Sequence, residues 1–156
     1  MTDMYLSVSL EAKHDFDTDA VTRRLGVEPT QIRKLGTPMH PGHDALYKYS
    51  SWEWDTGHIS ADDAGELIAQ AAAMFQSRAT VMRELADEYG GKWAIVLDGY
   101  VHSGDAPTVL LPPDFVEFCA AIGAIFQYVI DISYDYTSKG GAARGTAEDR
   151  PDTHRG

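Results

Sequence analysis

The chain has 156 residues, of which 44% are apolar and 24% charged, so we expect one globular domain with a substantial core. With 24 acidic against 13 basic side chains the formal net charge is -11, which argues against binding to nucleic acid or to an anionic membrane. The single cysteine, Cys119, cannot form an internal disulfide, and the first residues lack the pattern of a secretory signal. We therefore expect a cytoplasmic protein.

The N-terminal part of the chain predicts a strand, a short helix and a long loop. Residues 4–11 alternate apolar and polar side chains, which is typical of a half-buried strand. Asp17 or Thr18 can cap the helix that follows, and Gly26 is suited to end it in the left-handed conformation. Residues 29–44 contain several glycines and prolines without an apolar period, so they predict a surface loop.

The central part predicts a second strand and a long helix. Residues 46–55 are rich in tyrosine and tryptophan, which favours a strand. Ser60 with Asp63 three residues later resembles a capping box, and a helical apolar period then continues up to a pair of glycines. We expect one long, kinked helix over residues 60–89; the alternative is two helices that break near residues 76–80.

The C-terminal part predicts a strand, a helix and a last strand. Residues 93–101 are nearly all apolar on one side. Pro112 and Pro113 provide a rigid helix start, and Gly123 ends the helix. Residues 126–136 alternate again and predict the fourth strand.

Together these elements predict an α+β two-layer sandwich with a four-stranded, mainly antiparallel sheet, helices on one face and a ferredoxin-like character. We assign residues 1–137 to this single domain. Residues 138–156 contain no apolar side chain larger than alanine, so they predict a flexible tail. An exposed strand edge in such a sheet can also pair two copies into a homodimer.

Negative charge and tyrosines gather on the sheet face that the helices leave uncovered. Residues 45–137 hold fourteen acidic and four basic side chains. Strand alternation places the following candidate binding residues on this face, together with Glu11, Glu53 and Asp98: Tyr5, Tyr47, Tyr49, Tyr100, Asp131 and Asp135. Tyrosine offers a large contact area, and a negative field attracts a cationic partner. The alternative is that the face is polar only because it meets water.

A second candidate site involves the tryptophans of the second strand. Trp52 and Trp54 point the same way, most simply toward the helices as core residues. Alternatively they form the wall of a ligand pocket together with the loop 29–44 and with Arg33, which belongs to the only basic cluster.

The histidines, serines and glycines do not form a pattern that identifies a catalytic centre. His40 and His43 flank a Pro-Gly turn whose spacing fixes no metal geometry. His102 beside Ser103 lacks the oxyanion hole and strained elbow of a nucleophilic enzyme. The glycines do not have the spacing of a phosphate-binding loop. We therefore expect no catalytic residue, no metal and no cofactor.

Several stretches, taken in order and spacing, are similar to one bacterial family, domain of unknown function 4279. The resemblance covers about residues 4–136 and rests on six segments: 5–10, 16–30, 34–38, 51–53, 83–86 and 110–123. Trp52 matches a tryptophan typical of the family, and Gly26 and Pro29 match its helix-to-loop corner. The resemblance implies a single small bacterial domain without an assigned activity.

These observations lead to two functional hypotheses. The first is a non-enzymatic protein-binding module, of immunity or accessory type, that contacts a cationic protein through the acidic, tyrosine-bearing sheet face. The second is a small-molecule binder or enzyme with a pocket near Trp52, Trp54 and the loop 29–44. Charge reversal at Asp131 and Asp135 weakens a salt-sensitive complex only under the first hypothesis.

Overall fold

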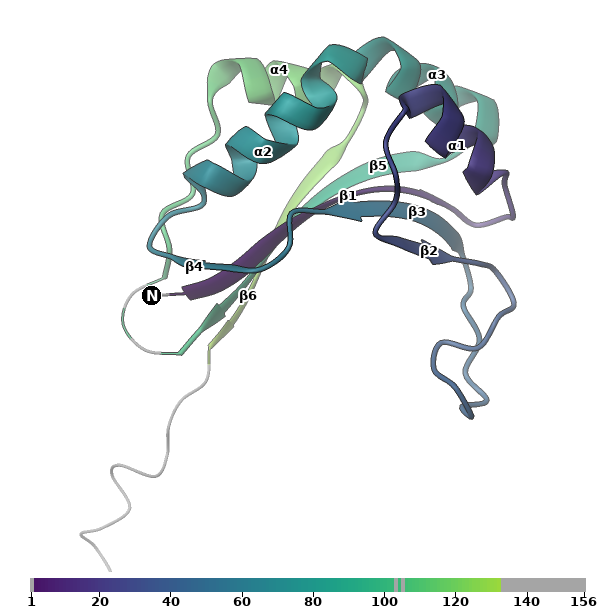
Figure 1. Cartoon of the computed structure of the whole chain (residues 1–156), viewed down its shortest axis with the longest axis horizontal. Helices are drawn as coiled ribbons and strands as arrows, with labels where there is room; N and C mark the ends of the chain where they lie inside the picture. The colour runs from purple at the N-terminus through teal and green to yellow at the C-terminus, as the bar shows by residue number, and fades with distance from the viewer. Residues whose placement is uncertain (1, 103, 105, 133–156) are drawn as a thin grey trace, which may run out of the picture.

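The fold is a layer of helices over one side of a curved, twisted sheet, shown as a computed structural model in Figure 1. The structure describes residues 2–102, 104 and 106–132. In chain order the elements are β1 (Thr2–Ala12), α1 (Thr18–Leu25), β2 (Gln31–Arg33), β3 (Ser50–Asp55), β4 (Ile59–Ala61), α2 (Gly65–Phe75), the 3-10 turn η1 (Gln76–Arg78), α3 (Ala79–Tyr89), β5 (Lys92–Val101), α4 (Pro113–Ala121) and β6 (Ile125–Ile132).

The sheet has six strands within the described residues, in the order β2-β3-β1-β5-β6, with β4 beside β1. β1 pairs antiparallel with β3, β4 and β5, whereas β6 runs parallel to β5 after a crossover through α4. The predicted α+β class is confirmed. The four-stranded, mainly antiparallel sheet of ferredoxin-like character is wrong in detail, because β2 and β4 have three residues each and are too short to show an alternating pattern.

The core lies between the helices and the sheet, and two tryptophans from different strands meet in it. Trp52 of β3 and Trp93 of β5 are fully buried, with ring centroids 6.1 Å apart. The Trp52 Nε1 donates to Thr22 Oγ1 at 3.0 Å, and the Trp93 Nε1 donates to the carbonyl of Met82 at 2.7 Å. Both indole nitrogens are therefore satisfied without water, as buried polar groups require.

The segment 60–89 is not one helix but two, joined by the 3-10 turn η1. Its predicted start is also wrong, because Ser60 lies in β4 and helix α2 begins only at Gly65. The N-cap position is Ala64, which makes no side-chain cap bond, and the Asp63 carboxylate just before it accepts from the Gly65 amide at 2.8 Å. At the break, the Arg78 side chain donates to the carbonyl of Leu25 at 2.8 Å, which ties the end of α1 to η1.

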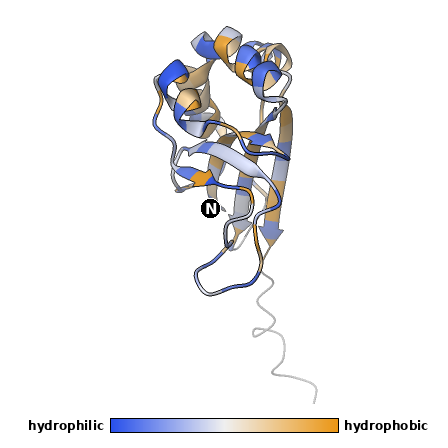
Figure 2. Ribbon diagram, turned by 90° about the vertical axis from the view of Figure 1, so that its right-hand side faces the viewer, coloured by the Kyte–Doolittle hydropathy of each residue, from blue (hydrophilic) through white to orange (hydrophobic). Residues whose placement is uncertain are grey.

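The ends of several predicted elements shift. Helix α1 begins after an Asp17 cap and ends at Gly26 with φ 67°, as predicted. The second strand is shorter than predicted, because residues 46–49 belong to the excursion 34–49 between β2 and β3. This excursion, here called the β2–β3 loop, hangs on the side of the sheet away from the helices (Figures 1 and 2). The predicted end of the last strand and the tail 138–156 lie outside the described residues.

Candidate functional site

The sheet face opposite the helices is left open in the part of the chain that the structure describes (Figure 1). The strand registers fix which side chains share it, because partners across a ladder point to the same side. We call this surface the open face. Its residues are Asp3, Tyr5, Ser7, Ser9, Glu11, Gln31, Arg33, Ser51, Glu53, Asp55, Lys92, Ala94, Val96, Asp98, Tyr100, Ile125, Gln127, Val129 and Asp131.

The middle of the open face is a floor of small side chains. Ser7, Ser9, Ser51 and Ala94 have exposed fractions of 5%, 2%, 0% and 6%, although no described helix covers them. Longer side chains share the face with them, and the Arg33 guanidinium donates to Ser51 Oγ at 3.4 Å. The floor thus has few rotamers to lose when a partner covers it, which lowers the entropic cost of binding.

One end of the open face, near β2, is held by an internal ion pair. The Arg33 Nη1 donates to Glu53 Oε2 at 2.8 Å, and its Nη2 donates to Gln31 Oε1 at 2.8 Å. Burial disfavours the charged guanidinium, but the hydrogen bond and charge of Glu53 outweigh it, so the pKa of Arg33 is raised. Because its cation is neutralised by Glu53 in a half-buried pair, this end carries little free charge.

The other end of the open face contains a cavity of about 190 Å³ where β1, β5 and β6 lie side by side. We call it the acidic pocket. Its lining combines three carboxylates with two phenol rings: Asp3, Tyr5, His58, Asp98, Gly99, Tyr100 and Asp131. Carboxylates beside aromatic rings are the groups that bind ammonium and guanidinium ions in proteins.

Tyr5 is the central ring of the acidic pocket. Burial raises its pKa to about 12, and the charge and hydrogen bond of Asp98 add to this effect. The phenol therefore stays neutral at physiological pH and donates to the Asp98 carboxylate. The His58 ring lies against it, with centroids 4.6 Å apart.

Asp3 forms the rim of the acidic pocket together with a histidine from the end of β5. The His102 Nε2 lies 2.7 Å from Asp3 Oδ2, and the His102 ring packs on Tyr100 with centroids 4.6 Å apart. The hydrogen bonds of His102 and Ser60 lower the pKa of Asp3, so its carboxylate is ionised at neutral pH.

The structure brings together only some of the predicted site residues. Tyr5, Tyr100 and Asp131 meet at the acidic pocket. Tyr47 and Tyr49 lie at the base of the β2–β3 loop, with ring centroids 5.9 Å apart, nearer the Arg33 end. Asp135 lies outside the described residues.

The pocket predicted between the tryptophans and Arg33 is not formed. Trp52 is fully buried on the helix side, and Trp54 packs there against Phe75 at 5.1 Å between ring centroids. Arg33 lies opposite Ser51 in the register and therefore on the open face. The sheet itself separates the proposed wall from the proposed cation, which a prediction without the register of β2 could not reveal.

Two lining residues of the acidic pocket, Asp3 and His58, and the rim residue His102 are absent from the sequence prediction as binding residues. Asp3 lies just before the predicted first strand, and His58 and His102 lie in connections whose position depends on β4 and on the end of β5. No local sequence pattern marks these residues, because the pairing of the neighbouring strands decides where each of them lies. Asp98 could be placed on this face by alternation alone.

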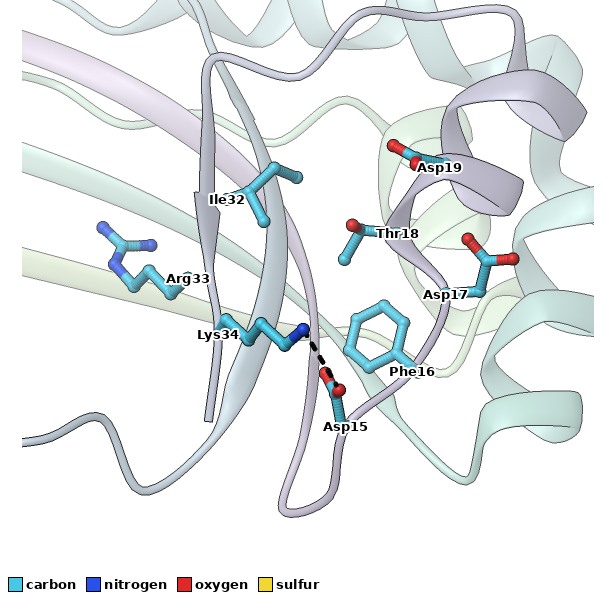
Figure 3. Close-up of a pocket in the computed structure, with 8 residues that line it drawn as sticks. All are labelled: Asp15, Phe16, Asp17, Thr18, Asp19, Ile32, Arg33 and Lys34. Atoms are coloured by element: carbon cyan, nitrogen blue, oxygen red, sulfur yellow. Dashed lines mark ion pairs between the residues drawn. The ribbon is translucent and has the colours of Figure 1, made fainter. Parts of the chain in front are cut away.

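A larger cavity of about 450 Å³ lies beside the edge strand β2 (Figure 3). Phe16, Thr18 and Ile32 point into it, and the Lys34 Nζ lies 3.8 Å from Asp15 Oδ2 at its rim. The Arg33 side chain turns away from this group toward the open face. The cavity thus combines a small apolar patch with a surface ion pair.

The described residues contain no group of three or more His, Cys, Asp or Glu side chains placed to hold a metal ion. Among the same residues, no helix has the length and apolar character needed to cross a membrane.

Comparison with known proteins identifies the family. Residues 2–133 match the family model described as Domain of unknown function (DUF4279). The chain belongs to this family. The match includes every helix and strand described above, and with them the whole acidic pocket, so this pocket is part of the DUF4279 domain and not of the tail. No curated protein and no solved structure matches the chain.

Proposed function

We propose that this DUF4279 domain is a non-enzymatic binding module that docks a cationic protein on its open face. A lysine or arginine side chain of the partner enters the acidic pocket and lies between the carboxylates and the rings of Tyr5 and Tyr100. The observation that carries the proposal is this arrangement of three carboxylates around two phenols, on a sheet face that no described helix covers.

The size of the acidic pocket supports a side chain as the occupant. Cavities that enclose drug-sized ligands usually measure roughly 300–1,000 Å³. At about 190 Å³ the acidic pocket is smaller than this range, yet it has room for the end of a lysine or an arginine. The rest of the partner would then cover the small-residue floor.

The charges of the acidic pocket support a cation. Asp98 and Asp131 contribute two carboxylates, of which Asp98 accepts a hydrogen bond from the Tyr5 phenol. An incoming cation would lose its water shell and contact these carboxylates and the face of an aromatic ring instead. The cation–π contact with the ring contributes about 0.5–2 kcal/mol to binding. The overall charge of -11 would accelerate the encounter, with a rate that falls as salt rises.

The β2–β3 loop supports a protein rather than a free amine as the partner. Leu35, Met39 and Leu46 are 37%, 41% and 48% exposed on this loop, which hangs on the open-face side of the sheet. Protein interfaces combine such apolar anchors with charged positions around them. An immunity or accessory role fits this picture, because acidic inhibitors can neutralise cationic toxins.

The test compares two charge reversals of equal size on opposite faces. Asp131→Lys changes the acidic pocket, and Glu117→Lys changes an exposed position on helix α4. Calorimetry with a peptide rich in lysine and arginine, capped at both ends, is expected to give at least tenfold weaker binding for Asp131→Lys and less than twofold for Glu117→Lys. Equal losses would mean attraction by net charge alone and would refute the proposed site.

One observation favours a second candidate, a small-molecule site at the larger cavity. Its volume of about 450 Å³ lies within the usual range for ligands, and the start of the predicted loop 29–44 lines it. A thermal-shift screen of small metabolites tests this candidate. Stabilisation that Ile32→Ala removes and Asp131→Lys leaves intact would favour it over the protein-binding module.

A further inference from the structure

We infer that the acidic pocket prefers arginine to lysine, so that the partner docks through a guanidinium. This inference rests on the proposed function and adds which cation the pocket accepts. Arginine and lysine carry the same charge, so attraction by net charge cannot distinguish them. Their shapes differ, because a guanidinium is flat with five N–H donors in a fixed fork, whereas an ammonium is compact with three donors. The preference therefore depends on how the carboxylates and rings of the pocket are arranged.

The three carboxylates of the acidic pocket differ in how far they are already engaged. Asp3 Oδ2 lies 2.7 Å from His102 Nε2, and Asp98 accepts a hydrogen bond from the Tyr5 phenol. Asp131 is exposed and makes no hydrogen bond or ion pair with another residue that the structure describes. Both oxygens of Asp131 can therefore accept from two parallel N–H groups, which is the bidentate geometry that arginine forms with a carboxylate.

The two tyrosines of the acidic pocket differ in the same way. Tyr5 is half-buried, its hydroxyl donates to Asp98, and the His58 ring lies against it at 4.6 Å between centroids. Tyr100 also contacts a histidine ring, yet it is 42% exposed. It pairs with Asp131 in the register of β5 and β6, so this ring and this carboxylate are neighbours on the open face. A flat guanidinium can stack on Tyr100 and keep the N–H groups at its edge for Asp131, whereas an ammonium has no flat face.

The spacing of two carboxylates on neighbouring strands also suits the wider cation. Asp98 pairs with Val129, and Asp131 lies two residues further along β6. With strands about 4.8 Å apart and a rise of about 3.3 Å per residue, the Cα atoms of the two aspartates lie about 8 Å apart. The donors of a guanidinium are distributed over three nitrogens, so one arginine can reach both carboxylates. The donors of an ammonium all leave one nitrogen and span a shorter distance.

The opposite end of the open face already binds a guanidinium between two strands. Arg33 donates from Nη1 to Glu53 Oε2 and from Nη2 to Gln31 Oε1, both at 2.8 Å. Glu53 and Gln31 are register partners on β3 and β2, so one side chain bridges the two strands. The acidic pocket offers carboxylates on β5 and β6, but none of its described lining residues is an arginine or a lysine. An arginine of the partner would supply the cation that this end lacks.

Two capped peptides of equal length and charge test the preference. One contains four arginines and the other four lysines, separated by glycine and serine. Both peptides are attracted equally by the net charge of -11, so a difference in affinity reports the shape of the cation. Calorimetry with the full chain is expected to give at least fivefold tighter binding of the arginine peptide. Equal affinities would overturn the inference and leave the proposed function standing, whereas no binding of either peptide would refute both.

Two substitutions at exposed residues test whether the preference arises in the acidic pocket. Asp131→Asn removes the charge at nearly constant shape, and Tyr100→Leu removes the ring. Each is expected to reduce the ratio of the two affinities to less than twofold. Glu11→Gln removes a charge from the open face at the far end of β1, outside the pocket, and should leave the ratio unchanged. A fivefold preference that survives both Asp131→Asn and Tyr100→Leu would place the arginine elsewhere and overturn the inference.

Discussion

The two faces of one sheet are built from neighbouring residues of the same strands, yet they have different roles. Trp52 and Trp93 on the helix side are fully buried by other elements. Their chain neighbours Ser51 and Ala94 on the open face are also buried, but no described helix covers them. Burial by helices stabilises the fold, whereas burial without a covering helix leaves a surface that a partner can still contact.

The largest effect is expected on the helix side. Trp52→Ala removes a fully buried indole and the hydrogen bond to Thr22, and should lower the free energy of unfolding by about 3–5 kcal/mol. Urea denaturation measures this change. A loss under about 1 kcal/mol would mean that the helix side does not carry the core.

We expect the Arg33 end of the open face to stabilise the fold, which sharpens the comparison of the two faces. Glu53→Gln leaves the half-buried guanidinium without its counter-ion and should cost about 1–3 kcal/mol of unfolding free energy. Glu11→Gln, at an exposed position of the same face, should cost less than about 0.5 kcal/mol. Equal losses of unfolding free energy for the two variants in urea denaturation would mean that the Arg33–Glu53 pair does not stabilise this end of the face.

The acidic pocket should be visible in the alkaline titration of the tyrosines. The pKa of Tyr5 is raised to about 12 by burial and by Asp98, while the unfolded value is about 10. The contribution of Tyr5 to the free energy of unfolding is therefore fully present below pH ~10 and is lost as the pH rises through the folded pKa. Tyr5→Phe should remove the last step of the tyrosinate absorbance titration. Removal of an earlier step would contradict the position given to Tyr5.

The smallest effect is expected at the rim of the acidic pocket. His102 and Ser60 lower the pKa of Asp3 below its ordinary value of about 3.8, so the stabilisation exists above that value and disappears as the pH falls through the folded pKa. His102→Ala should therefore flatten slightly the dependence of the melting temperature on pH below about 4. His43→Ala, in the β2–β3 loop, should leave the profile unchanged. The same response in both variants would rule out a specific Asp3–His102 interaction.

The sequence predicts β1, β5 and both ends of α1 well, because alternation and capping are properties of adjacent residues, whereas the predicted cap at Ser60 is wrong. The alternating residues of β1 and β5, the Asp17 cap and the Gly26 end agree with the structure. It also predicts that Trp52 is a core residue, because a large apolar ring on the helix side of a strand is most simply buried between the sheet and the helices.

Long-range pairing accounts for most of what the sequence does not reveal. β2 and β4 form because β3 and β1 offer free edges, and three residues carry no periodic signal of their own. The parallel pairing of β6, and with it the meeting of Asp131 and Tyr5 at one pocket, depends on where α4 returns the chain. Neither distance along the chain nor composition encodes that return.

The most direct test of the account locates the cationic peptide on the protein by amide chemical shifts. The account predicts shifts at the open-face residues around the acidic pocket, in β1, β5 and β6, that disappear in Asp131→Lys and persist in Glu117→Lys. Shifts confined to the helices, or spread evenly over both faces, would contradict the claim that the open face is the binding surface.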